Sequence, residues 1–241
     1  KPIATNLDDA DQMIEAPEQA GETLMVGHSF GYETPIKAMR ETIRAGDLGP
    51  LRMVHNWYFT DWMYRPRNPE ELDTSLGGGV TFRQGSHQFD IIRLLGGGLV
   101  RSVRAMTGKF DPGRPAEGAH TVFLDFEEGV VATAVYNGYD RFRSAELGFN
   151  VGEGGQPFNL DTYGGARAAL ADVGTTGEQL LKRNVRYGAS GARNRETPPN
   201  HPFYGLTIAS CERGDVRQSP DGLLVYTETD KREIRLTKGI S

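Results

Sequence analysis

The feature that most limits the fold is a run of strand patterns that follow one another without a helix between them. Residues 100–107, 120–126, 130–137 and 144–151 all have the character of β-strands, and Glu128–Gly129 is a typical hairpin turn. Short turns join antiparallel neighbours, whereas parallel strands need a long crossover connection. This part of the chain therefore predicts an antiparallel sheet.

Helical patterns precede these strands. Asn6 and Asp9 form a capping-box pattern at the start of one helix, which a glycine ends. Residues 34–45 and 80–95 carry apolar residues at helical spacing, and glycines follow both segments. The order of elements predicts one α+β domain over residues 1–241, with helices on one face of the sheet.

The remaining segments give shorter or weaker patterns. Residues 158–195 mix glycine with basic residues and give no firm prediction. Further strands are expected over residues 23–26, 52–60, 223–227 and 233–236, a helix over 203–213, and a loop over 61–74.

Composition excludes several classes of protein. Lys and Arg number 27 against 32 Asp and Glu, a net charge of −5, so composition gives no support to a nucleic-acid-binding surface. No apolar run approaches the roughly 20 residues of a membrane span. The single cysteine, Cys211, allows no internal disulfide, and scattered histidines give no metal-ligand spacing. A cytoplasmic protein without a membrane partner or a metal site is expected.

The segment from Gly77 to Asp90 is the most informative for chemistry. On a helix, Arg83, His87 and Asp90 would share one stripe, which brings together a cation, a titratable base and a carboxylate. Imidazole has an ordinary pKa near 6.5, which suits proton transfer, and Asp90 would orient its far nitrogen. The alternative is a surface histidine with a local carboxylate partner and a solvated arginine.

Several motifs occur in an order and spacing that resemble one oxidoreductase family. They are Lys1-Pro2, the helix at 7–11, residues 24–28, the turn at 46–49, the glycines at 77–79, and Gly85-x-His87-x-x-Asp90. Together they are similar to the glucose-fructose oxidoreductase, inositol dehydrogenase and MocA family. The resemblance implies a C-terminal domain with an open, mostly antiparallel sheet. It also implies a dinucleotide-binding Rossmann domain before Lys1, which this sequence does not contain.

The family resemblance implies roles for individual residues. His87 matches the family's general acid/base, which takes the hydroxyl proton as hydride leaves the same carbon. Lys1 matches a catalytic lysine beside the nicotinamide, and with Pro2 it is the expected contact to NAD or NADP. Most of the cofactor would be bound by the missing domain. The chain alone is therefore expected to be inactive.

One position departs from the family pattern. The family commonly has Asp four residues before the histidine, whereas this chain has Arg83, whose guanidinium suits a carboxylate. We therefore expect a small anionic substrate. Other candidate substrate contacts are Arg65, Arg67, His28 and Asp90. Residues 64–73, 82–85 and 210–215 are similar to a branch that oxidises phthalate 4,5-cis-dihydrodiol, which suggests a carboxylated cyclic diol and a place in phthalate degradation.

Two alternatives remain open. One is a sugar or cyclitol dehydrogenase domain in which Arg83 forms an internal ion pair. The other is a non-catalytic oligomerisation or binding module. The resemblance implies that the open face of the sheet joins subunits, so a homodimer or tetramer is expected in either case.

Overall fold

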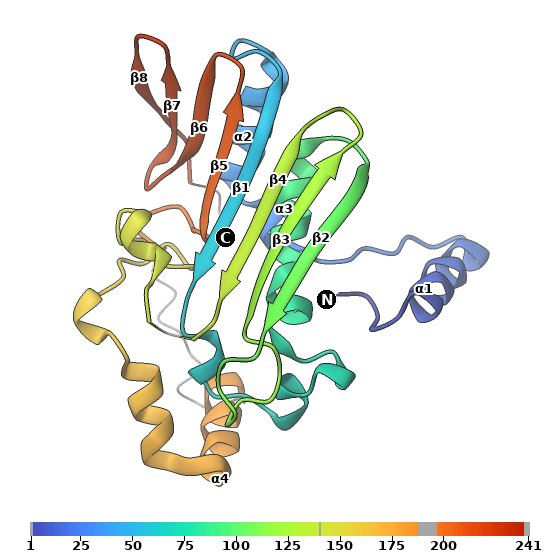
Figure 1. Ribbon diagram of the computed structural model, residues 1–241, viewed down its shortest axis with the longest axis vertical. Coiled ribbons are helices and arrows are strands. Elements are labelled where there is room, and N and C mark those ends of the chain that lie inside the picture. Colours follow the sequence, from blue (N-terminus) through green and yellow to red (C-terminus); the bar gives the residue numbers. More distant parts are fainter. Residues whose placement is uncertain (1, 140, 188–196, 239–241) are drawn as a thin grey trace.

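The computed structural model, which describes residues 2–139, 141–187 and 197–238, is built on one eight-stranded sheet (Figure 1). The strands lie in the order β2-β3-β4-β1-β5-β6-β7-β8. Of the described pairs, β1 and β4 are parallel and the others are antiparallel. The predicted α+β architecture with an open, mostly antiparallel sheet is confirmed. The strands are β1 (Leu51–Phe59), β2 (Val100–Gly108), β3 (Ala119–Phe126), β4 (Val131–Asn137), β5 (Leu206–Cys211), β6 (Gly214–Ser219), β7 (Gly222–Thr227) and β8 (Lys231–Arg235).

Two helices cover one face of the sheet, α2 (Thr34–Ala45) and α3 (Ser86–Gly96) (Figure 1). Their apolar residues recur at helical spacing, so that Met39 of α2 and Ile92 of α3 are fully buried in the core. α2 ends where Gly46 adopts a φ of 80°, a left-handed conformation that glycine takes without strain. The core therefore lies between these helices and the sheet.

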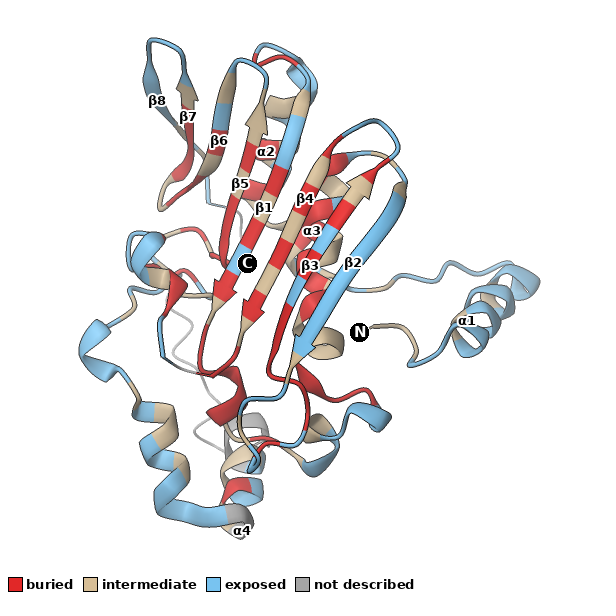
Figure 2. Ribbon diagram, viewed as in Figure 1, coloured by how far each residue is buried: buried red, intermediate tan, exposed pale blue. Residues whose placement is uncertain are grey.

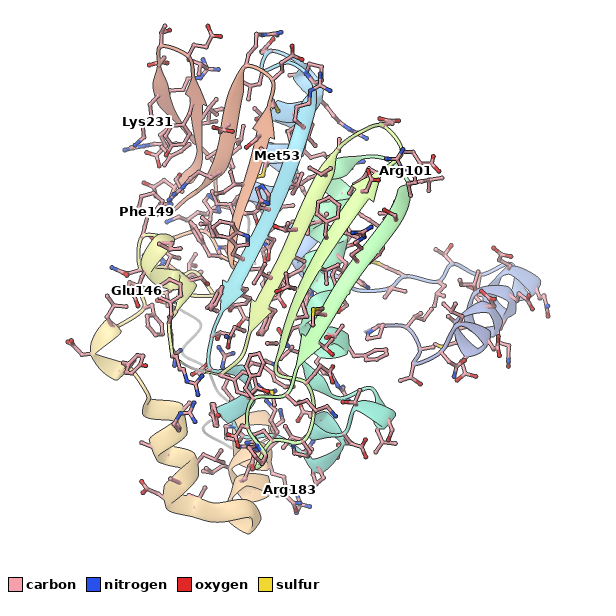
Figure 3. All side chains as sticks on the ribbon, viewed as in Figure 1. Met53, Arg101, Glu146, Phe149, Arg183 and Lys231 are labelled. Atoms are coloured by element: carbon pink, nitrogen blue, oxygen red, sulfur yellow. The ribbon has the colours of Figure 1, made fainter. Side chains whose placement is uncertain are left out.

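The two faces of the sheet differ in what covers them. On β1, Val54 and Asn56 point to the helices and are fully buried, whereas Met53 and Trp57 are 41% and 39% exposed on the opposite face (Figures 2 and 3). Side chains alternate between faces along a strand, and the pattern holds from Met53 to the end of β1. In the part of the chain that the structure describes, no helix covers the face that carries Met53 (Figure 1).

Three predictions about the sheet are wrong. Residues 203–213, expected as a helix, form β5 and a turn, and β6 follows as a strand that the sequence pattern does not indicate. Residues 144–151, expected as a strand, begin with a 3-10 turn at Ser144–Leu147. Residues 23–26, also expected as a strand, pair with no described neighbour. A short apolar segment becomes a strand only where a partner is available, as β5 finds between β1 and β6.

The helix α4 (Gly165–Tyr187) forms where the sequence gives no firm prediction, and non-helical backbone at Gly174 interrupts it. No helix in the described residues is both long and apolar enough to cross a lipid bilayer. The short turns of 3-10 helix are η1 (Ser29–Tyr32), η2 (Trp62–Tyr64), η3 (Pro69–Leu72), η4 (Thr74–Leu76), η6 (Ser144–Leu147) and η7 (Leu160–Thr162).

The helix α1 (Leu7–Ala20) stands away from the rest of the molecule (Figure 1). Its start is capped as predicted, because the Asn6 side-chain oxygen accepts a hydrogen bond of 2.8 Å from the Asp9 amide. None of its residues is buried, and its apolar side chains lie in solvent, with Leu7 81% exposed (Figure 2). The helix has no packing partner among the described residues.

Candidate active site

The site is built on a π-helical turn, Thr81–Gly85, that runs directly into α3. Two side chains from distant parts of the chain hold the junction through its backbone carbonyls. The Tyr204 hydroxyl donates to the Gln84 carbonyl at 2.8 Å, and His28 Nδ1 lies 3.1 Å from the Ser86 carbonyl. π-helical turns are rare and are frequent at functional sites. The observed turn replaces the first turn of the α-helix predicted over residues 80–95.

His87 follows this turn and is buried among aromatic rings. The Phe30 ring meets its imidazole edge-on at a centroid distance of 4.7 Å, and the Tyr204 ring lies at 5.1 Å. The His28 ring is 6.2 Å away. Packing on several sides limits the orientations open to the imidazole, as acid/base chemistry requires. Sequence reasoning missed Phe30 and Tyr204, because both are far from His87 in the chain.

A buried polar network fixes the first turn of α3 onto the sheet. The Gln88 amide donates to Asn56 Oδ1 at 2.6 Å, and its oxygen lies 2.8 Å from His120 Nε2. Burial lowers the pKa of His120 to about 4, so its ring is neutral at neutral pH and Nε2–H donates to Gln88. Since Gln88 is adjacent to His87, this network fixes the position of the His87 backbone relative to the sheet.

Asp90 lies beside His28. One carboxylate oxygen is 3.9 Å from His28 Nδ1. Burial raises the pKa of Asp90, although His28 and Arg93 oppose that rise. The structure thus pairs Asp90 with His28, in the region of His87.

Arg83, on the π-helical turn, stands out from the other arginines predicted for the site. It is half-buried, and it forms no hydrogen bond or ion pair with any described residue. Its Nε is shielded from solvent without an acceptor. A guanidinium in such a position is usually paired, since leaving buried donors unsatisfied costs about 1–3 kcal/mol or more. Arg83 therefore offers donors to a ligand.

Arg65 is bound internally. It donates to Asp61 at 2.6 Å and to Glu153 at 3.3 Å. Burial alone would raise the pKa of Asp61, but Arg65 and Arg143 outweigh it and hold that pKa below its ordinary value. Arg65 and Arg143 line a small cavity together with Tyr58 and Glu153.

Arg67 is bound internally as well. Its guanidinium donates to Glu71 at 3.1 Å and stacks on the Trp62 ring at 3.9 Å. It lines a second, larger cavity formed with α4, and neither of these two cavities is lined by His87. The structure therefore brings His28, Arg83, His87 and Asp90 onto one region and leaves Arg65 and Arg67 in others.

The start of the chain lies near this region. Lys1, a predicted catalytic and cofactor-binding residue, is outside the described residues, and Pro2 is half-buried. The Thr5 side chain packs against Gly77, at the glycine run that leads into the π-helical turn (Figure 1). The described residues contain no group of three or more His, Cys, Asp and Glu side chains able to hold a metal ion.

Known proteins are similar to this chain in sequence. Residues 36–151 match the GFO/IDH/MocA C-terminal domain family. The 1-carboxy-3-chloro-3,4-dihydroxycyclohexa-1,5-diene dehydrogenase of Comamonas testosteroni is 36% identical over 229 residues, which cover 94% of this chain and 58% of that protein. The inositol 2-dehydrogenase of Arthrobacter sp. FB24 is 27% identical over 63% of this chain and 42% of its own.

Solved structures agree with the fold. A protein of Bordetella bronchiseptica RB50, named as a dehydrogenase, matches with a TM-score of 0.92 and 39% identity, over 99% of this chain and 62% of its own. An inositol dehydrogenase homolog of Azotobacter vinelandii, solved with NAD⁺, matches with a TM-score of 0.64 at 14% identity, over 98% of this chain and 49% of its own. The matched regions thus span between 42% and 62% of the length of these relatives.

Proposed function

The chain belongs to the GFO/IDH/MocA family, and from that premise we propose that it is the substrate-binding and acid/base domain of an NAD(P)-dependent dehydrogenase for a carboxylated cyclic cis-diol. The observation that carries the proposal is Arg83, a half-buried guanidinium without a described counter-charge on the turn that leads to His87. A carboxylate on the substrate would supply that charge.

His87 is the general acid/base of the proposed reaction. Hydride loss from a carbinol carbon leaves a cation unless the hydroxyl proton departs as well, so a base must lie at that oxygen. The imidazole is held between Phe30 and Tyr204 and is next to the anchored Gln88. This packing supports a single productive orientation, and Lys1 is the proposed second contact to the same oxygen.

Arg83 is the proposed anchor for the substrate carboxylate. A guanidinium binds a carboxylate through two parallel hydrogen bonds, which fixes both the position and the plane of the ligand. The name of the Comamonas testosteroni relative specifies a dihydroxycyclohexadiene that carries a carboxyl group. That chemistry supports an anionic ring substrate, of which a phthalate dihydrodiol is one example.

The cofactor would be bound mainly outside the described residues. NAD(P)⁺, when bound, accepts the hydride. The glycines of residues 152–155 lie in a loop and not between a strand and a helix, where a dinucleotide-binding turn would lie. The exposed apolar side chains of α1 and residues 24–25 support a preceding domain that packs on them. Lys1 and Pro2 would lie at that junction, beside the nicotinamide.

The open face of the sheet is the proposed subunit contact of a homodimer or tetramer. Met53, Trp57 and Phe123 are each about 40% exposed on that face. Apolar side chains gathered on one uncovered sheet face are typical of a protein interface. The contact would lie on the opposite side of the sheet from α3 and the candidate site.

The test is a substrate comparison in the full-length dehydrogenase. Arg83→Ala should raise KM for a carboxylated dihydrodiol about 10- to 100-fold and change KM for the matching uncarboxylated diol much less. Arg52→Ala, which removes an exposed arginine paired with Glu212, is the control. If KM rose equally for both diols, Arg83 would not be the carboxylate anchor. Turnover of cyclitols alone by the unaltered enzyme would favour a cyclitol dehydrogenase. A full-length protein inert toward all of these would favour a binding module.

A further inference from the structure

A second imidazole stands next to the catalytic candidate. The ring centroids of His28 and His87 are 6.2 Å apart. The two residues come from separate parts of the chain, a loop before α2 and the first turn of α3. Two bases this close together can reach neighbouring carbons of one substrate ring, because such carbons are only about 1.5 Å apart.

The hydrogen bonds of His28 decide which of its nitrogens is available. Nδ1 lies 3.1 Å from the Ser86 carbonyl, and a carbonyl oxygen only accepts, so Nδ1 carries the hydrogen. In the neutral ring Nε2 is then the basic nitrogen. Asp90 lies 3.9 Å from Nδ1, where its negative charge would stabilise the imidazolium that forms when Nε2 takes a proton.

The proposed substrate gives such a base a task. Oxidation of one carbinol carbon of a dihydroxycyclohexadiene produces a hydroxyketone, which is not yet aromatic. The neighbouring carbinol carbon must still lose its C–H proton before the ring becomes a catechol. A cyclitol or sugar needs no second step, because its ketone is the product.

We propose that His28 is a second catalytic base, which removes this C–H proton and aromatises the ring; the inference rests on the proposed function. In the first step the carbinol carbon would give its hydride to NAD(P)⁺, when that cofactor is bound, and the hydroxyl proton passes to His87. In the second step the neighbouring C–H bond breaks, its proton goes to His28 Nε2 and its electron pair forms the ring double bond. The ketone oxygen then takes back the proton from His87, and His28 releases its proton to water.

The experiment follows both products in one turnover of the full-length enzyme. The probe is 3,4-dihydroxycyclohexa-1,5-diene-1-carboxylate, with NADH and catechol absorbance recorded together after rapid mixing. In the unaltered enzyme the two signals should rise together. His28→Asn retains a donor for the Ser86 carbonyl but has no base. In this variant the rate of catechol formation should be about 100-fold lower than the rate of NADH formation. Asp90→Asn, which retains the base, should give a smaller difference between the two rates.

Arg52→Ala is the control. The exposed Arg52 side chain pairs with Glu212 at 3.0 Å, and its replacement should leave the two signals together. Coincident signals in a folded His28→Asn enzyme, whether fast or slow, would overturn the role of His28. Absence of NADH formation by the unaltered enzyme would instead overturn the proposed function, so the two failures are distinguishable.

Discussion

The π-helical turn and the loop that follows β1 both carry arginines, but only the loop arginines are paired with carboxylates. In the loop, Arg65 and Arg67 are held by Asp61, Glu71 and Glu153. On the turn, Arg83 has no such partner among the described residues. A buried charge is costly unless it is paired, so the loop arginines support the fold. Arg83 is the arginine whose charge an anionic ligand would pair with.

Among changes at the π-helical turn, His87→Asn should cause the largest loss of activity. Removing the proposed base should lower kcat of the full-length enzyme about 10²- to 10⁴-fold, because general acid/base catalysis contributes that much. The variant should fold, since asparagine places a planar polar group of smaller size where Phe30 and Tyr204 pack around the imidazole. The measurement is steady-state kcat together with a thermal melt. A kcat within a few-fold of the original would show that the turn does not carry the chemistry.

Among changes in the loop, Asp61→Asn should have the largest effect. It should lower the free energy of unfolding rather than the activity. Asp61 binds Arg65 at 2.6 Å and Arg143 at 2.9 Å, and it is 12% exposed. Breaking a buried ion pair from one side typically costs about 3–5 kcal/mol. Urea denaturation of this chain gives the free energy of unfolding. The comparison between turn and loop would fail if stability stayed the same while substrate affinity fell.

The ion pairs of Asp61 should also make the stability of the chain depend on pH in the acid range. Because the pKa of Asp61 is lowered in the folded protein by Arg65 and Arg143, the unfolded chain binds the proton more readily. The stabilisation is complete above the ordinary carboxyl pKa of about 3.9 and is lost as pH falls through the lower folded value. Denaturation midpoints between pH 6 and pH 3 should fall less in Asp61→Asn than in the unaltered chain. Parallel curves for the two proteins would contradict the assigned cause.

The sequence identifies the candidate side chains of the turn, but not the geometry in which the fold places them. The stripe of Arg83, His87 and Asp90 comes from spacing alone, and local spacing is what a sequence reports directly. The π-helical turn, the Tyr204 contact and the pairing of Asp90 with His28 depend on residues brought together from far apart in the chain. No local pattern contains that information.

The same limit explains the errors in the fold. Residues 34–45, 52–60 and 100–107 are predicted well, because helices and hairpins there follow local periodicity and turns. The strand β5 is misread as a helix because its identity depends on pairing with β1, more than 140 residues earlier. The segment 23–26 is the reverse case, an apolar stretch without a described partner.

The smallest effect is expected at the edge strand β2, where Arg101 binds Asp125 at 2.6 Å (Figure 3). The Arg101 side chain is 61% exposed, and exposed ion pairs contribute about 0–1 kcal/mol. Arg101→Ala should therefore change the free energy of unfolding by less than about 1 kcal/mol. Urea denaturation at two protein concentrations checks this value. A larger loss that grows with concentration would place the pair within a subunit interface, because only association makes stability depend on concentration.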